Sequence, residues 1–217
     1  MAQIIKFPAQ ASKFGYKRVK RRAASAEDPN QLPLFAQPTA TILRLDAVFG
    51  PFEQALRLDE LDDQRAEDFY RQAIAEQDCV ADAYCNLGIL QSKRGQTAKA
   101  FDSFTKSLKH EPRHFEAHYN LGNLYLDNGD HRLAQVHFQI AAEIDPAFPN
   151  LHFNLALALA VNNELTAAIA ALKTYQSLVS VEEARKANDL LANLQQSLAI
   201  ASWKVENEKI ARGEPSV

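Results

Sequence analysis

A triplet of asparagine, leucine and a small residue recurs every 34 residues in this chain and constrains its fold more than any other feature. The three copies begin at Asn86, Asn120 and Asn154. A fixed period of this length predicts a helical repeat array, in which each unit buries its apolar face against the next one. Asparagine is a mediocre helix former. Its recurrence in phase therefore indicates a helix face with a role besides packing.

Other residue types keep the same phase. Glycine and asparagine tolerate a left-handed helix end, and such ends are expected at Gly95, Gly129 and Asn163. A small residue and then a large apolar residue follow four positions apart, which places them on one helix face. Proline, which cannot continue a helix, closes the first two units. These columns are Ala100, Ala134 and Ala168; Phe104, Phe138 and Leu172; and Pro112 and Pro146.

Together these columns resemble the tetratricopeptide repeat (TPR) family over roughly residues 47–180. The resemblance implies an all-α fold, in which antiparallel helix pairs stack into a TPR-type right-handed superhelix that binds peptides or protein partners. It divides an array at 46–180 into a degenerate repeat at 47–80 and repeats at 81–114, 115–148 and 149–180.

The region after the array reads as a capping helix. Ser180 and Glu183 form a capping box, and leucines follow at helical spacing, at positions 190, 191, 194 and 198. An array needs such a terminal helix to cover its last apolar surface. We expect this helix over 181–205, with Trp203 packed at its end, and a frayed tail at 206–217.

Charge separates the first 45 residues from the rest. They hold eight Lys and Arg against two acidic residues, whereas the remainder holds sixteen against twenty-five, which gives the net charge of −3. We predict a basic, mostly disordered arm and linker at 1–45, with the first helix beginning near Asp46 as N-cap. The longest apolar run is too short to cross a bilayer, so a cytoplasmic protein is expected.

The arm offers several functions. Its cations, with Phe14 and Tyr16 among them, suit binding to nucleic-acid phosphates and bases. Alternative binding partners are an acidic protein, an anionic membrane and the chain's own groove. The arm could instead be a mitochondrial import signal or a solvated tail. The candidate phosphate-binding residues are Lys17, Arg18, Lys20, Arg21 and Arg22.

A second linear motif lies in the linker. The pentapeptide from Gln31 to Phe35 is similar to the motif by which bacterial proteins bind the DNA sliding clamp. That resemblance implies a Gln that hydrogen-bonds in one pocket and apolar residues that fill another. The matching positions are Gln31, Leu32, Leu34 and Phe35. The apolar residues could instead cover the edge of the first repeat.

The TPR resemblance places the asparagines on the inner surface of the array, where a carboxamide can pair with the main chain of any peptide. Some TPR domains hold a terminal carboxylate with Lys and Arg near this column. Here Asp82, Glu116 and Asn150 stand four residues before the asparagines, so a basic or neutral segment is favoured. The predicted peptide-binding groove consists of Asn86, Asn120, Asn154, Asp82, Glu116, Tyr119, Asn123, Asp127 and Phe153. The column at Tyr84, His118 and His152 is expected to pack between helices.

No catalytic, metal or cofactor motif is recognised. The histidines at 110, 114 and 118 have helical spacing, but Pro112 breaks that helix between the first two. A phosphate loop and a nucleophile elbow are missing from the sequence. We therefore expect a protein that is not an enzyme and needs no cofactor.

Three functions remain open. The first is an adaptor that binds a peptide or protein in its groove. The second is a DNA-associated factor that uses the arm and the clamp-like motif. The third is a regulatory subunit of an enzyme or envelope complex. The oligomeric state stays open.

Overall fold

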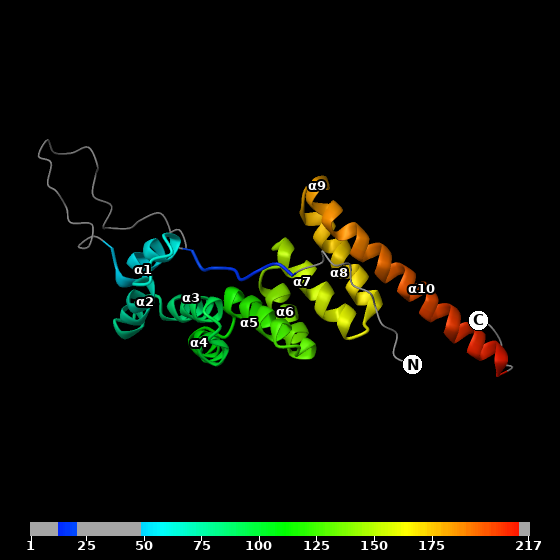
Figure 1. Cartoon of the computed structure of the whole chain (residues 1–217), viewed down its shortest axis with the longest axis horizontal. Coiled ribbons are helices and arrows are strands. Elements are labelled where there is room, and N and C mark those ends of the chain that lie inside the picture. The colour runs from blue at the N-terminus through cyan, green and yellow to red at the C-terminus, as the bar shows by residue number, and fades with distance from the viewer. Residues whose placement is uncertain (1–12, 21–48, 213–217) are drawn as a thin grey trace, which may run out of the picture. The chain divides into compact units, whose positions relative to one another are not determined.

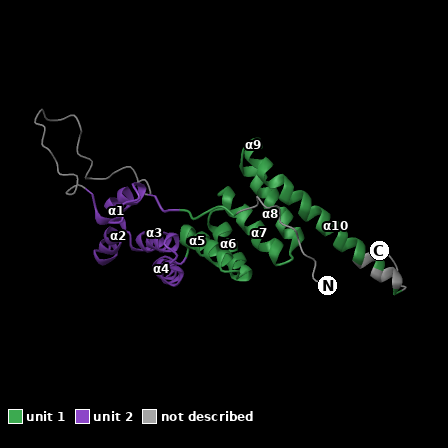
Figure 2. Cartoon of the chain, viewed as in Figure 1, with its two compact units in different colours: residues 1–17, 113–217 green, residues 18–112 purple. Residues whose placement is uncertain are grey.

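The computed structural model describes residues 13–20 and 49–212, and every regular element within these ranges is a helix (Figure 1). The expected all-α fold class is therefore confirmed. The helices fall into two compact units (Figure 2). Unit 1 holds residues up to Lys17 together with Arg113–Val217, and unit 2 holds Arg18–Pro112. None of the helices in the described part is long and apolar enough to cross a membrane.

Unit 2 consists of two helix pairs. Helices α1 (Pro51–Glu60) and α2 (Ala66–Ala75) form the first pair, and α3 (Val80–Lys93) and α4 (Thr97–His110) form the second. Its core contains Phe52, Tyr70 and Leu87. Helix α1 begins at Pro51, since proline suits a first helical position. The predicted N-cap near Asp46 lies outside the described residues.

Unit 1 continues the same pattern with α5 (Phe115–Asp127), α6 (His131–Ile144), α7 (Pro149–Val161) and α8 (Leu165–Leu178). A short helix α9 (Val181–Ala184), a 3₁₀ turn η2 (Arg185–Ala187) and the long helix α10 (Asn188–Ala211) follow. The division of the chain into repeats stays a prediction, although each predicted full repeat contains one pair of these helices.

The predicted left-handed helix ends are confirmed. Gly95 and Gly129 follow α3 and α5 with φ angles of 71° and 79°, and Asn163 follows α7 with φ 65°. Asparagine replaces glycine at the third position because it is among the few residues that tolerate this conformation. The prolines at 112 and 146 each come two residues after a helix ends.

The glycines of the asparagine triplets have a steric cause. A Cβ added at Gly122 would lie 2.5 Å from the Phe138 ring, and one at Gly88 would lie 2.8 Å from the Phe104 ring. The paired helices therefore approach so closely that the aromatic ring covers bare backbone. In the third repeat Ala156 and Leu172 occupy the same columns. There alanine replaces the smaller glycine, and leucine replaces the larger phenylalanine.

The C-terminal cap differs in part from the prediction. Ser180 accepts a hydrogen bond from the Glu183 N–H, as expected for a capping box, and Leu190 and Leu194 are fully buried. The packed position expected for Trp203 is wrong, because 68% of this residue is exposed. Helix α10 also runs to Ala211, beyond the expected end at residue 205.

Candidate functional site

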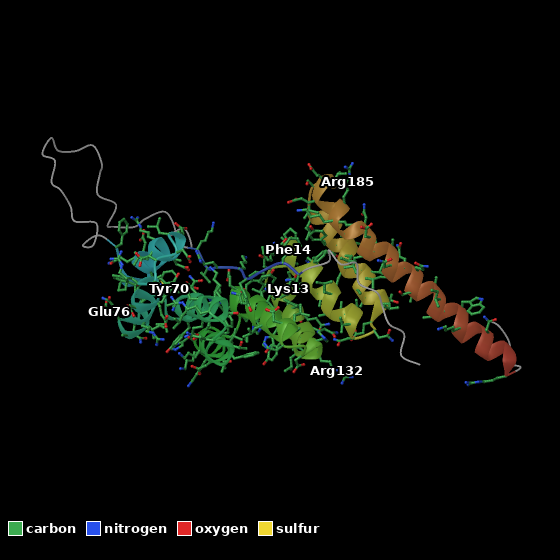
Figure 3. All side chains as sticks on the ribbon, in the orientation of Figure 1. Lys13, Phe14, Tyr70, Glu76, Arg132 and Arg185 are labelled. Atoms are coloured by element: carbon green, nitrogen blue, oxygen red, sulfur yellow. The ribbon has the colours of Figure 1, made fainter. Side chains whose placement is uncertain are left out.

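The most informative contacts involve residues 13–20, here called the arm segment. This segment has no regular secondary structure. It is drawn in blue in Figure 1, and its first two residues are labelled in Figure 3. Its residues up to Lys17 contact unit 1, and those from Arg18 onward contact unit 2. The two sets of contacts are described separately.

Each ladder asparagine pairs with one arm residue through the main chain. In unit 1 the Phe14 N–H donates to Asn154 Oδ1 at 2.7 Å, and Asn154 Nδ2 donates to the Phe14 carbonyl at 2.8 Å. Asn120 binds Lys17 in the same way, at 2.7 and 2.8 Å. In unit 2 Asn86 binds Val19 at 2.9 and 3.0 Å.

All three asparagine residues are fully buried. A buried carboxamide that is left without hydrogen bonds is costly, and the main chain of the arm segment provides a donor and an acceptor for each of them. The surface of each unit on which its ladder asparagines meet the arm segment is called the ladder face below.

Unit 1 adds a polar cluster around Gly15. The Tyr119 hydroxyl donates to the Gly15 carbonyl at 3.0 Å, and Asn123 Nδ2 donates to the same oxygen at 3.3 Å. Asn154 also contacts both side chains, with Asn123 Oδ1 at 2.7 Å. Burial raises the pKa of Tyr119 to about 12, so its hydroxyl stays protonated and able to donate at neutral pH.

Aromatic rings of unit 1 surround two arm side chains. The Phe14 ring meets Phe153 edge-on at a centroid distance of 5.2 Å and lies 5.9 Å from the Tyr175 ring. The Lys17 ammonium lies 4.1 Å from the centroid of Phe115 and 4.3 Å from that of Phe148. These geometries are typical of aromatic pairing and of cation–π attraction.

Carboxylates of the same unit contact the arm cations. Lys17 Nζ is 3.5 Å from Glu116 Oε1, and Lys13 Nζ is 3.4 Å from Asp127 Oδ2. The Tyr16 hydroxyl donates to the Asp127 carboxylate at 3.2 Å. The ladder face of unit 1 therefore combines main-chain pairing with contacts to aromatic and cationic side chains of the arm segment.

Unit 2 holds its part of the arm segment through a buried carboxylate. Asp59 on α1 is 3% exposed, and its Oδ1 accepts from the Arg18 guanidinium at 2.6 Å. The Tyr70 hydroxyl donates to its second oxygen at 3.2 Å. Burial raises the pKa of Asp59, and the charge of Arg18 opposes that increase. Val19 is only 2% exposed.

Most of the predicted groove residues contact the arm segment. In unit 1 these are Asn120, Asn154, Glu116, Tyr119, Asn123, Asp127 and Phe153, and in unit 2 Asn86. Asp82, the remaining predicted groove residue, lies in the first turn of α3. The carboxylate that pairs with Arg18 in unit 2 is that of Asp59. The role of the groove residues in binding a partner stays a prediction.

The residues of the column at Tyr84, His118 and His152 contact neighbouring parts of the array, and His152 Nε2 lies 2.7 Å from the Pro146 carbonyl oxygen. Tyr84 stacks on His110, and His118 Nδ1 lies 3.0 Å from His137 Nδ1. Burial and the neighbouring His118 lower the pKa of His137 to about 4. This histidine is therefore neutral at physiological pH and can accept the hydrogen bond within the pair.

Several partners of the arm segment were not identified from the sequence. Phe115, Phe148 and Tyr175 belong to unit 1, and Asp59 and Tyr70 to unit 2. Asp59 had a readable signal, because it stands 68 residues, or two periods, before Asp127. It also shares an apolar helical stripe with Phe52 and Ala55, and a charged residue in such a stripe needs a partner.

The basic residues predicted to bind phosphate do not share one environment. Lys17 and Arg18 meet Glu116 and Asp59, and Lys20 is exposed. Arg21 and Arg22 lie outside the described residues, as do the clamp-like positions Gln31, Leu32, Leu34 and Phe35.

Sequence comparison identifies the repeats. A family model described as tetratricopeptide repeat matches residues 85–147 and again 119–192. Anaphase-promoting complex subunit 3 from Schizosaccharomyces pombe is 41% identical over 64 residues. This match covers 30% of the chain and 10% of that protein's length.

Solved structures resemble the fold. MamA 41-end from Desulfovibrio magneticus RS-1 gives a TM-score of 0.60 at 20% identity, over 76% of this chain and 96% of that one. TTC0263, a TPR protein of Thermus thermophilus, gives 0.53 at 23% identity, over 68% and 81%. The first TPR domain of Spaghetti (RPAP3), bound to the HSP90 peptide SRMEEVD, gives 0.51 at 18% identity, over 55% and 93%.

Proposed function

Because the chain is a tetratricopeptide repeat protein, we propose that it is a non-catalytic scaffold that binds an extended peptide or protein segment on its ladder faces. The observation that carries this proposal is the pairing of three fully buried asparagines with the main chain of an irregular segment. The carboxamides pair with N–H and C=O groups of that segment. They can therefore hold any extended segment that presents those groups in the same spacing.

Charge on the ladder faces favours a basic or neutral segment. Glu116 and Asp127 line the face of unit 1, and Asp59 lies in that of unit 2. The peptide bound to the RPAP3 domain contains three carboxylate side chains in SRMEEVD. Such a ligand would meet like charges here. We therefore propose that this chain has a different ligand class from that domain.

The test compares wild-type protein with a chain that carries Asn86→Ala, Asn120→Ala and Asn154→Ala. Binding is measured to an array of synthetic peptides that range from acidic to basic. Wild type is expected to retain basic and neutral peptides over acidic ones, and the triple variant is expected to lose that binding. Far-UV circular dichroism verifies that both proteins keep their helices.

A matched control removes carboxamides elsewhere. Gln195 and Gln196 are exposed on α10, and their replacement by Ala should leave the array unchanged. If the triple ladder variant and wild type bind the same peptides with the same strength, the ladder faces are not the binding site and the proposed function fails.

A further inference from the structure

The arm segment meets the ladder faces through its side chains as well as its main chain. Three side chains are enclosed: Phe14 by aromatic rings, Lys17 by rings and a carboxylate, and Val19 by the interior of unit 2. Gly15 and Lys20, by contrast, are exposed. The enclosed positions define a sequence preference that the asparagines alone cannot provide.

We propose that the arm segment is a tethered ligand of the ladder faces. We also propose that an external ligand of unit 1 is a basic segment with an aromatic residue three positions before a lysine, and that a ligand of unit 2 presents an arginine followed by a β-branched apolar residue. Such a partner must displace the arm segment. This inference rests on the proposed function, because it names the ligand class of the same faces.

The order of the required residues follows from the contacts. In unit 1 the aromatic position is fixed by Asn154 and the lysine position by Asn120, three residues apart along the segment. In unit 2 the arginine is selected by Asp59 and the apolar residue by its burial next to Asn86. Phe14 and Lys17 provide the two groups for unit 1, and Arg18 and Val19 provide the two for unit 2.

Covalent attachment makes the arm segment a strong competitor. A tethered ligand acts at an effective concentration on the order of 1 mM, so an arm segment whose own dissociation constant is about 0.1 mM would weaken the binding of a free peptide roughly tenfold. The chain would therefore respond only to partners that match these positions well or are locally concentrated.

The experiment uses the full-length chain and a labelled peptide with the sequence of residues 12–21. The comparison is between wild type and a variant with Phe14→Ala and Val19→Asp, which weakens the arm without touching a helix. Fluorescence anisotropy should show that the variant binds the free peptide about tenfold more tightly than wild type. Equal affinity for the two proteins would overturn the proposal.

A scrambled peptide of the same composition separates sequence from charge. It should bind the variant at least roughly tenfold more weakly than the ordered peptide, because the enclosed side chains no longer match their sites. Equal binding of both peptides would show recognition by charge alone and would also overturn the proposal.

Limited trypsin digestion tests occupancy in the unmodified protein. Cleavage after Lys17 and Arg18 should be about tenfold slower in wild type than in the variant with Phe14→Ala and Val19→Asp. This protection should not change when the protein is diluted. Protection that disappears on dilution would mean that the segment comes from a second copy, and absence of protection would mean that the faces are empty; either result would overturn the proposal.

Failure of this inference can be distinguished from failure of the proposed function. The variant with Phe14→Ala and Val19→Asp is called the arm variant. If it binds the free peptide no more tightly than wild type, but the triple asparagine variant still loses peptide binding, the faces bind a partner and the arm is not their ligand. If neither change alters peptide binding, both proposals fail.

Discussion

The ladder faces of the two units make the same main-chain contact with the arm segment but different side-chain contacts. Each of their asparagines pairs with the N–H and C=O of one arm residue. In unit 1 the Phe14 side chain meets the rings of Phe153 and Tyr175, and Lys17 meets those of Phe115 and Phe148. Cys85 is the residue of unit 2 that directly precedes its ladder asparagine, and the side-chain contact there is between Arg18 and the buried Asp59.

This difference separates affinity from specificity. The asparagine contact is indifferent to the sequence of a ligand, whereas the ring-lined and carboxylate sites distinguish aromatic, lysine and arginine side chains. One repeated helix face can therefore carry a common binding mode and a sequence-specific one. Substitutions that remove only the main-chain contact or only the side-chain contacts should therefore affect the two units differently.

The largest effect is expected from Gly122→Ala in unit 1. The new methyl group would lie 2.5 Å from the Phe138 ring, and overpacking of this kind costs about 1–3 kcal/mol. We expect a net loss of about 2 kcal/mol in the free energy of unfolding, after the helix-propensity gain of about 1 kcal/mol. Urea denaturation measures it.

The same change in unit 2 provides the comparison. Gly88→Ala places the methyl group 2.8 Å from the Phe104 ring and should destabilise less. Adding Phe138→Leu to Gly122→Ala should recover part of the loss, because the third repeat already combines Ala156 with Leu172. If Gly122→Ala is neutral, the close helix approach is not what fixes glycine there.

The next largest effect should distinguish the contacts of the individual ladder asparagines. Asn120→Ala removes both main-chain hydrogen bonds to Lys17, with a cost of about 1.4 kcal/mol, or roughly tenfold, in binding of the arm segment. Trypsin cleavage after Lys17 should accelerate by roughly fivefold, because the arm segment would then be free in about half of the molecules. Asn86→Ala should instead accelerate cleavage after Lys20 more than after Lys17, since it releases Val19. The same cleavage pattern for both variants would contradict separate contacts.

A third prediction concerns the aromatic site of unit 1. Replacing Lys17 by Met in the free peptide removes the cation–π contacts and the Glu116 ion pair, which we expect to cost about 1 kcal/mol, or roughly fivefold in affinity. Lys20→Met is the matched control, because Lys20 is exposed. Calorimetric titration of the arm variant with each peptide measures the difference. Equal losses would indicate a general charge effect.

A smaller effect should appear in unit 2 on acidification. Burial raises the pKa of Asp59, whereas the charge of Arg18 opposes that increase. Arg18 therefore favours the ionised carboxylate, and peptide affinity should fall, by roughly threefold, as the pH drops and Asp59 takes up a proton. Asp59→Asn should remove this part of the pH dependence.

The stability of the wild-type protein should change with pH in the opposite direction. The raised folded-state pKa means that Asp59 stabilises the fold most at acid pH, and that this contribution is lost as the pH rises through the folded-state pKa. The difference in unfolding free energy between the wild-type protein and the Asp59→Asn variant should therefore depend on pH. A difference that is constant across pH would mean that the pKa of Asp59 is not raised.

Periodicity predicted those parts of the molecule that repeat. The left-handed positions at Gly95, Gly129 and Asn163 were correct, since a 34-residue period fixes where each helix must end. Asp59 was missed because the first repeat lacks the asparagine that marks the others. The prediction that Trp203 is packed was wrong because its helix continues past the last repeat that it could cover.

The arm segment could not be placed by the same reasoning. It has no regular secondary structure and repeats nothing, so no periodic signal linked Phe14 to Asn154 across 140 residues. Only its basic charge, set against Asp82 and Glu116, indicated the ladder faces as one possible site. Aromatic contacts such as those of Phe148 depend on loop geometry between helices, which residue spacing does not specify.

The smallest effect should come from Gly15, which tests whether the arm is recognised by its main chain at that position. A Cβ at Gly15 would meet no atom within 4 Å, and its carbonyl would still accept from Tyr119 and Asn123. The Gly15→Ala peptide should therefore bind within roughly a factor of two of the original. Val19→Ala is the comparison, because Val19 is buried in unit 2 and its truncation should weaken binding more. A large loss at Gly15 would mean that unit 1 requires backbone freedom there, and selection by enclosed side chains alone would then be insufficient.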